Sequence, residues 1–133
     1  MKKLGILLFC ITSIISCNNL GNPIIEIINP EIDLGTIPHN DKRDFYIKIR
    51  NGGTSDLIIK KLQPSCSCIV DKEFELLTIK AKKTDSIKLT MVANNYGNHT
   101  EKVAILSNTE SGYSIVNINS YTEKPEQLER LEN

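Results

Sequence analysis

Two cysteines separated by a single residue are the side chains of this sequence with the most evident chemistry. Cys66 and Cys68 lie in the segment QPSCSCIV (63–70). A Cys-x-Cys pair can close a disulfide, exchange electrons with another thiol, or offer two thiolates to a soft ion such as Cu(I). It can also be two small residues in a local structural role. The cellular compartment limits these uses, because disulfides persist only in oxidising surroundings.

The N-terminus indicates an exported protein. Met1-Lys2-Lys3 is a short positive region, and LGILLFCITSII (4–15) is an apolar run that falls short of the ~20 residues of a membrane-spanning helix. The run ends in Ile14-Ile15-Ser16-Cys17, which resembles the bacterial lipobox. That resemblance implies cleavage before Cys17 and a diacyl or triacyl anchor on this residue, which would keep the chain on a membrane. The expected location is the bacterial cell envelope, at the periplasmic face or the cell exterior.

Such processing would leave 117 residues, about the size of one domain. The two lysines of the signal would be lost with it, so 14 basic residues would face 16 acidic ones. This balance argues against nucleic acid as a partner, since nucleic-acid binders carry clustered positive charge. Cys10 would leave with the signal and Cys17 would carry lipid. An intrachain disulfide would then have to join Cys66 to Cys68.

The spacing of the pair limits what it can do. In an extended strand, Cα atoms two residues apart are ~6.6–7 Å from each other, at or beyond the upper disulfide limit of ~6.8 Å. A bridge therefore requires a turn or bulge at Cys66–Cys68, and we expect it to be easily reduced. Zinc would need four ligands, for which the spacing is unsuitable. His39 and His99 fall in expected loops and Met91 in an expected core position, so the sequence places no further copper ligand beside the pair.

Strands must position this segment. The run DFYIKIR (44–50) alternates apolar and polar residues, which is the period of a half-buried strand. Asn51-Gly52-Gly53 follows as a turn in which a positive φ costs little. DLIIKKL (56–62) then reads as a second strand, joined to the first by a hairpin or a sheet-to-sheet connection. Further strands are expected at EIDLGTI (31–37), FELLTI (74–79), DSIKLTMV (85–92), KVAILS (102–107) and YSIVNIN (113–119).

About seven short strands separated by turns predict an all-β protein folded as an antiparallel sandwich. Phe45, Ile47 and Ile49 are expected inside it, with the alternate residues of that strand in solvent. The expected organisation is a lipoprotein signal peptide (1–16), lipidated Cys17 with a polar tether (17–23), one sandwich domain (24–122) and a polar tail (123–133) with at most a turn or two of helix.

Several short motifs follow one another in residues 31–108. They are Asp33-Leu34-Gly35-Thr36-Ile37, Arg50-Asn51-Gly52-Gly53, Leu57-Ile58-Ile59, Pro64-Ser65-Cys66-Ser67-Cys68 and Ser107-Asn108. This order of motifs resembles the bacterial DUF1573 family, whose members are exported domains of immunoglobulin-like fold related to the ASH and major sperm protein group. Ser67 stands where the family usually has glycine between the cysteines. The segment Ala81-Lys82-Lys83-Thr84 stands where the family usually has a Pro-Gly turn.

The resemblance implies a fold and an exported location, without a defined activity. No nucleophile elbow, phosphate loop or metalloprotease helix motif is present in the sequence, so we expect a protein that is not an enzyme. The first functional interpretation is a membrane-anchored binding or scaffolding module that holds an unidentified protein partner through sheet edges or loops. The alternative is a thiol-based copper or redox carrier that uses Cys66 and Cys68. For the pair itself, a local structural role is the first interpretation, metal binding the second and redox exchange the third.

Overall fold

The structure is a computed structural model that describes residues 20–72, 74–125 and 130–131. Cys17 and the signal peptide lie outside these residues. So does most of the tail (123–133), for which the sequence predicts at most a turn or two of helix. Residues 123–125 have no regular structure, and none of the described residues belongs to a helix that could span a membrane. The strands are β1 (Ile25–Ile27), β2 (Glu31–Thr36), β3 (Lys42–Asn51), β4 (Leu57–Pro64), β5 (Ile69–Val70), β6 (Leu77–Ile79), β7 (Thr84–Val92), β8 (Gly97–Ser107) and β9 (Tyr113–Thr122).

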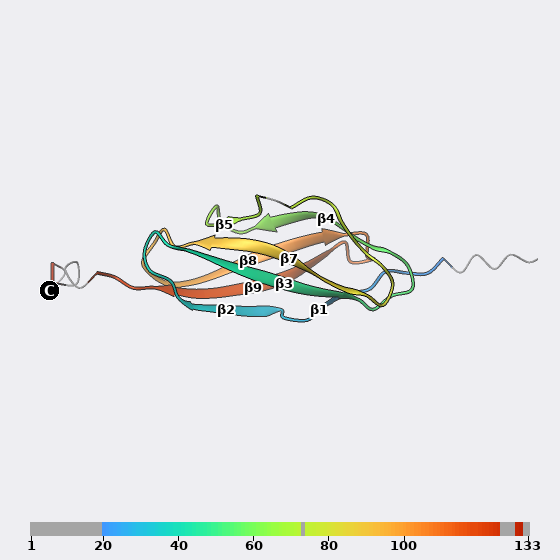
Figure 1. Cartoon of the computed structure of the whole chain (residues 1–133), viewed down its shortest axis with the longest axis horizontal. Coiled ribbons are helices and arrows are strands. Elements are labelled where there is room, and N and C mark those ends of the chain that lie inside the picture. Colours follow the sequence, from blue (N-terminus) through green and yellow to red (C-terminus); the bar gives the residue numbers. More distant parts are fainter. Residues whose placement is uncertain (1–19, 73, 126–129, 132–133) are drawn as a thin grey trace, which may run out of the picture.

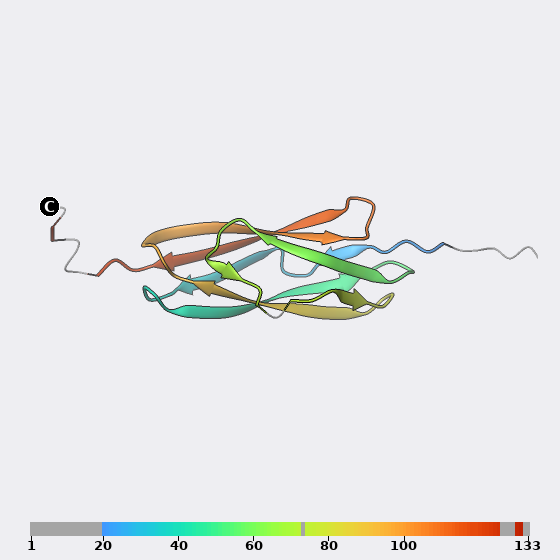
Figure 2. The same ribbon diagram turned by 90° about the horizontal axis from the view of Figure 1, so that it is seen from above.

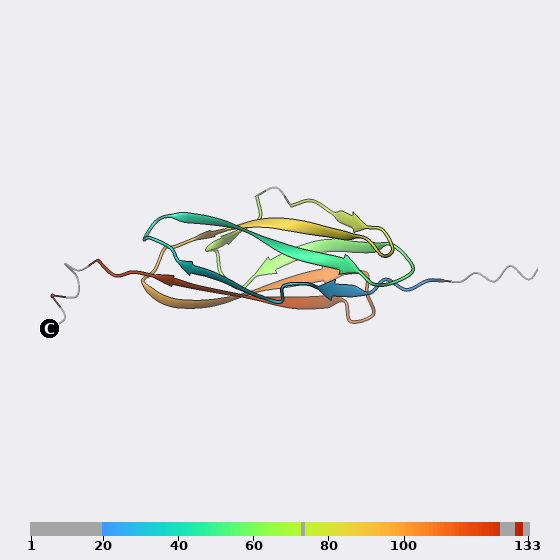
Figure 3. The ribbon, with the colours of Figure 1, turned by 60° about the horizontal axis from the view of Figure 1, so that its bottom comes forward.

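The strands form two stacked sheets, which confirms the predicted all-β sandwich (Figures 1 and 2). The first sheet has the order β1-β3-β7-β5 and the second has the order β2-β9-β8-β4-β6. The pairs are antiparallel with one exception, because β2 runs parallel to β9. The chain reaches this arrangement by passing from β1 in the first sheet directly into β2 in the second, along one side of the sandwich (Figure 3).

The predicted strands are present, and their ends differ. The connection between residues 44–50 and 56–62 joins the two sheets, since β3 and β4 belong to different ones. FELLTI contributes only its last three residues, as β6. β8 starts at Gly97, five residues before the expected start, so His99 lies in a strand and its assignment to a loop was wrong.

Apolar side chains that alternate along the strands fill the space between the sheets. Phe45, Ile47 and Ile49 of β3 are buried and the residues between them are exposed, as their pattern predicts. β7 lies antiparallel to β3 and contributes Ile87, Leu89 and Met91 to the same core, as its own alternation predicts. The second sheet supplies the facing half of the core, and its principal residues are Leu57 and Ile59 of β4, Val103 and Ile105 of β8, and Val116 and Ile118 of β9.

A buried asparagine organises the turn that follows β3. Asn51 has no exposed surface, and its side-chain amide donates to the carbonyl oxygens of Ser55 at 2.7 Å and Ile79 at 2.9 Å. Its carbonyl oxygen accepts the N–H groups of Gly53 at 3.0 Å and Ile24 at 3.3 Å. One side chain therefore ties together the start of β1, the loop before β4 and the end of β6.

Of the two glycines after Asn51, Gly53 is needed, and for a different reason from the one expected. Neither has a positive φ, so the expectation of left-handed backbone at this turn was wrong. A Cβ atom on Gly53 would lie 2.1 Å from the carbonyl oxygen of Asn22, which no side chain could tolerate. The left-handed conformation occurs instead at Lys82, with φ of 64°. This is the turn where the DUF1573 pattern usually has Pro-Gly, and glycine would adopt that φ without a steric penalty.

Candidate functional site

The cysteine pair forms a disulfide in the turn between β4 and β5. The Cα atoms of Cys66 and Cys68 are 5.1 Å apart, well inside the range for disulfides and shorter than an extended strand allows. The backbone around the pair is fixed on both sides. The N–H of Ile69 donates to the carbonyl oxygen of Cys66, and the N–H of Val92 in β7 donates to that of Cys68 at 2.8 Å.

A small pocket opens beside the two sulfur atoms at this end of the sandwich. Its volume is ≈110 Å³, and Met91, His99 and Glu101 line it together with the two cysteines. His99, Glu101 and Val103 occupy every second position of β8, so their side chains lie on the same face of the strand. Val103 is buried in the core, and His99 and Glu101 therefore face inward at the end of the sandwich. The fold thus brings His99 and Met91 to the pair, although no pattern in the sequence places them there.

Glu101 is the residue of this site that the sequence did not identify. A carboxylate oxygen of Glu101 and the sulfur atoms of Cys66 and Cys68 all lie within 4.8 Å of one another, and all three residues are partly buried. The Ser65 hydroxyl donates to the Glu101 carboxylate at 2.6 Å and accepts the N–H of Lys102 at 2.8 Å. The segment 97–101 looks like a loop in the sequence, which hid the strand alternation that directs Glu101 inward.

The bridge has a limited structural role. It encloses only one residue between its two ends, and short loops remove little conformational entropy from the unfolded chain. Both cysteines pack against the hydrophobic core, so they contribute local packing. As a disulfide, the pair offers no thiolates to a metal. After reduction, it would present two thiolates beside one carboxylate.

The other residues considered from the sequence lie elsewhere. His39 is in a turn, where its ring stacks at 4.3 Å on that of Tyr96. Asp44 is exposed on β3, and the hydrogen bond from Lys88, followed by that from the Thr90 hydroxyl, lowers the pKa of its carboxyl below the ordinary value. These contacts link β3 to β7 on the outer surface of the sheet, so Asp44 acts as a local cross-strand partner.

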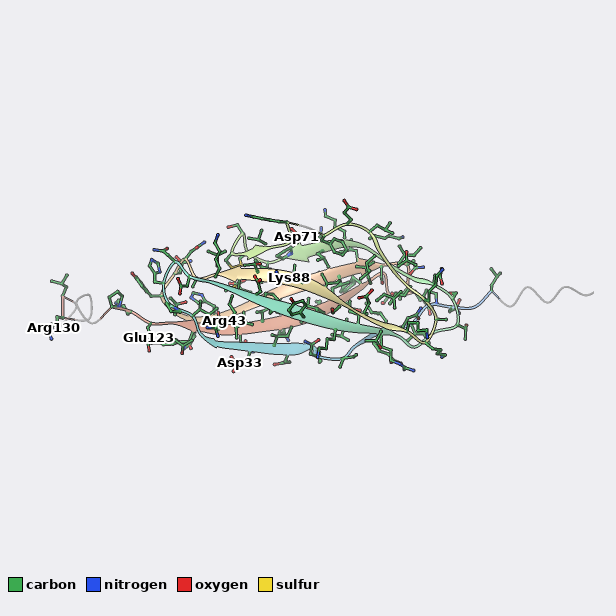
Figure 4. The ribbon with its side chains drawn as sticks, in the orientation of Figure 1. Asp33, Arg43, Asp71, Lys88, Glu123 and Arg130 are labelled. Atoms are coloured by element: carbon green, nitrogen blue, oxygen red, sulfur yellow. A yellow bond between two sulfur atoms is a disulfide. The ribbon has the colours of Figure 1, made fainter. Side chains whose placement is uncertain are left out.

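Two sides of the sandwich are shielded against additional strands. On one side, the guanidinium group of Arg43 donates to the carbonyl oxygens of Leu34 at 2.8 Å and Thr36 at 3.3 Å, which closes the end of β2 (Figure 4). On the opposite side lie the short strands β5 and β6, and both Phe74 in the segment between them and Leu77 of β6 pack against the core. Side-chain caps and covering segments of this kind are common protection for sheet edges.

The first residues of β9 form an open edge. β9 pairs with β8 from Tyr113 onward, but it pairs with β2 only from Asn117 onward, because β1 belongs to the other sheet. The N–H of Asn117 donates to the carbonyl oxygen of Pro30, so the N–H and C=O of Ile115 point to the same side by alternation. Within residues 20–72 and 74–125, no strand pairs with Ile115 on that side.

Exposed apolar side chains accompany this edge. Tyr113 and Ile115 expose 58% and 47% of their surface on the outer face of the second sheet. Their cross-strand partners on β8, Leu106 and Ala104, are only partly buried. Two apolar rows therefore lie side by side next to backbone groups that can accept another strand.

Comparison with solved structures supports the immunoglobulin-like fold. A protein of unknown function from Porphyromonas gingivalis W83 has a TM-score of 0.63 at 14% identity, over 75% of this chain and 47% of that one. The seventh ASH/PapD-like domain of human CEP192 has a TM-score of 0.62 at 11% identity, over 77% and 87%. The Caenorhabditis elegans major sperm protein family member WR4 has a TM-score of 0.50 at 8% identity, over 74% and 97%.

The chain spans less than half of the Porphyromonas protein and 32% of VesB, a Vibrio cholerae protease that it matches with a TM-score of 0.54 at 11% identity over 77% of its own length. At such identities the likeness concerns the fold alone. A search of curated proteins finds no match by sequence.

Comparison of the sequence with protein-family models identifies a family, whereas the solved structures show only a shared fold. The model described as "Protein of unknown function (DUF1573)" matches residues 25–122, from the first residue of β1 to the last of β9. The motifs on which the resemblance rested all lie within this range, including the buried Asn51 turn and the disulfide turn. The chain therefore belongs to the DUF1573 family.

Proposed function

We propose that this protein is a lipid-anchored, non-enzymatic binding module of the bacterial cell envelope that holds a partner protein at the open edge of β9. The observation that carries the proposal is the uncovered backbone of Ile115, which lies beside the exposed side chains of Tyr113 and Ile115. An extended peptide that adds to a sheet edge gains main-chain hydrogen bonds, and alternate side chains supply specificity. The structure offers both features at one place.

The edge of β9 suits this role better than the edge of β2 does. A strand added beside β2 would compete with Arg43 for the carbonyl oxygens of Leu34 and Thr36. At the start of β9, the Ser111 hydroxyl donates to the carbonyl oxygen of Tyr113 at 3.2 Å, and a donor on the partner would have to displace only this one contact. The partner is expected to be an extended segment with at least one apolar side chain to cover Tyr113 and Ile115.

The alternative function, a thiol-based copper or redox carrier, has less support. Both sulfur atoms are joined in the bridge, so in this state the pair offers no thiolate to a metal ion or to an oxidised partner. A binding role at β9 does not depend on the cysteines. It should therefore persist when both are replaced by serine.

Site-specific cross-linking in the native cells would test the binding edge. With a photoreactive residue at position 113, we expect a discrete adduct with one partner protein. A photoreactive residue at Tyr46, equally exposed but on the other sheet, serves as the control and should not give that adduct. Ile115→Pro should abolish the adduct, because proline removes the N–H that points away from β8 and leaves the β8 ladder intact.

The fold of the Ile115→Pro protein should be checked by its thermal unfolding, with Ile115→Lys as a second variant that keeps the N–H but places a charge in the apolar row. We expect Ile115→Lys to weaken the adduct as well. An adduct at position 113 that survives both substitutions, or that forms equally from Tyr46, would contradict the proposed edge.

The anchor is tested separately at Cys17. Intact-mass measurement of the protein from wild-type cells should show a chain that begins at Cys17 and carries two or three acyl groups. Cys17→Ala should leave the signal attached and remove the acyl mass, with Cys10→Ala in the signal as the matched control that is processed normally. A mature wild-type protein without acyl groups would rule out the lipoprotein assignment.

A further inference from the structure

The environment of the disulfide contains a feature that the binding role leaves unexplained. A carboxylate would be expected to point into solvent, yet Glu101 is partly buried on the inward-facing side of β8 with an oxygen within 4.8 Å of both cysteine sulfurs. A hydrogen bond from Ser65 holds it there, and Ser65 is itself fixed to the backbone of Lys102. The contacts between Ser65, which follows β4, and β8 thus fix the position of the carboxylate.

We propose that the Cys66–Cys68 disulfide covers a cation site, which reduction opens, and that both thiolates and the Glu101 carboxylate then bind one Zn²⁺. This site lies away from the β9 edge and does not depend on the proposed binding role. Cysteine sulfur and carboxylate oxygen are both established zinc ligands. The mixed set favours zinc over Cu(I), because a soft Cu(I) ion prefers sulfur alone whereas a carboxylate suits a harder ion.

Electrostatics explain why a cation would belong here. With the bridge intact, Glu101 is the single negative charge of the cluster. With the bridge reduced and both thiols ionised, three negative charges would lie within a few ångströms of one another in a partly buried pocket, where their repulsion is screened less than in water. A divalent cation among them converts this repulsion into attraction. The disulfide state needs no cation, so occupancy follows the redox state of the pair.

The geometry requires only a local movement. Zinc–sulfur bonds are about 2.3 Å long, so two sulfurs on one tetrahedral zinc are about 3.8 Å apart. The turn already holds the two Cα atoms 5.1 Å apart with both sulfurs facing the same pocket, and the bond from Val92 to Cys68 anchors its second half. Breaking the sulfur–sulfur bond lets the side chains rotate apart while the backbone stays in place. The sequence spacing alone does not supply the four ligands that zinc needs, but the fold adds the Glu101 carboxylate as a third ligand and water can complete the set.

The chemical step is a thiol–disulfide exchange with a dithiol. One thiolate of the dithiol attacks a sulfur of the bridge, and its second thiolate then resolves the mixed disulfide. Two electrons and two protons pass to Cys66 and Cys68, and the dithiol becomes a disulfide. Zn²⁺ binding afterwards displaces the two thiol protons into solvent. In the reverse exchange, a disulfide outside the protein takes up the two electrons, binds two protons from solvent and becomes a dithiol, while the Cys66–Cys68 bond forms again and the ion is released.

Zinc titration of the two redox forms of the full-length protein in mild detergent would test this proposal. One portion is left oxidised. The other is reduced with dithiothreitol and freed of reductant by desalting without oxygen. Zn²⁺ is then added against a competing chromogenic chelator. We expect one equivalent bound by the reduced protein and none retained by the oxidised protein. Co²⁺ in place of Zn²⁺ should give thiolate-to-metal charge-transfer absorption in the reduced form alone.

Three variants separate this site from adventitious binding. Cys66→Ser with Cys68→Ser should abolish retention of zinc. Glu101→Gln should weaken it by about tenfold or more, since loss of an outer-shell partner already costs that much. Glu110→Gln, in the loop between β8 and β9, is the matched control and should leave the affinity unchanged.

Two results would overturn the proposal. Equal zinc retention by reduced and oxidised wild-type protein would show that the cysteines are not ligands. Equal affinities of the Glu101→Gln and Glu110→Gln proteins would remove the carboxylate from the site. Because the cobalt absorption of the reduced wild-type protein reports thiolate ligation directly, it answers the first question without any variant. Ile115→Pro, which removes the proposed binding edge, should leave zinc binding unchanged.

Discussion

Replacing Asn51 by leucine is expected to lower the free energy of unfolding by about 3 kcal/mol or more. Leucine has the same branched skeleton with somewhat more bulk, so the change removes hydrogen bonds without opening a cavity. The side chain of Asn51 is completely buried and bonds to the carbonyl oxygens of Ser55 and Ile79 and to the N–H groups of Gly53 and Ile24. Each of these backbone groups would be left without its partner, and an unsatisfied buried polar group costs about 1–3 kcal/mol.

Asn108 provides the matched comparison for this measurement. Its side chain also links backbone segments, because it accepts the N–H of Ile58 and donates to the carbonyl oxygen of Asp56. However, Asn108 is only partly buried and makes two such bonds, so water can replace it. Urea unfolding of both variants should therefore show the larger loss at position 51. A cost at Asn51 no larger than that at Asn108 would contradict the structural role assigned to this turn.

The regular strands of the sandwich were accessible from the sequence because each carries its own periodic signal. Residues 44–50 alternate strictly, and β3 buries Phe45, Ile47 and Ile49 as that pattern requires. By contrast, β1 and β5 contain three and two residues, too few to establish a period. Tertiary pairing with β3 and β7 is what makes them strands.

The candidate sites were predicted less completely, for two physical reasons. Cys66 and Cys68 stand out because of their chemistry and spacing, but Glu101 becomes their neighbour only when β8 extends back to Gly97 and pairs with β9. The open edge of Ile115 likewise depends on the place where the chain changes sheets between β1 and β2. Neither the contact of Glu101 with the cysteines nor the open edge at Ile115 depends on residues that are close together in the sequence. Both arise from the registers of strands that are distant along the chain.

The two candidate sites lie at opposite ends of β8. Its first residues lie beside the disulfide turn, and its last residues pair with the open start of β9. The described chain enters at Leu20, at the same end as the β8–β9 hairpin (Figures 2 and 3). The proposed anchor on Cys17 would therefore place the binding edge near the membrane, and the disulfide would be held away from it, where soluble dithiols and metal ions have access.

Replacing Ile47 by alanine is expected to lower the free energy of unfolding by ~2–5 kcal/mol, as large-to-small changes in a packed core do. Ile47 has no exposed surface and lies opposite Ile87 of β7, in the middle of the longest pairing of the first sheet. The neighbouring sheet packs over it, so the lost atoms would leave a cavity that rigid strands on both sides cannot fill.

Lys48→Ala is the control for Ile47, since it changes the next residue of the same strand on the opposite face. The Lys48 side chain is exposed, and its N–H keeps its bond to the Asn29 side chain in the variant. We expect a change within ~0.5 kcal/mol. In urea unfolding, the midpoint should fall for Ile47→Ala at unchanged slope, which shows that stability and not the unfolded state has changed. Equal losses at both positions would mean that Ile47 does not face the core and Lys48 does not face solvent, so the register of β3 would be wrong.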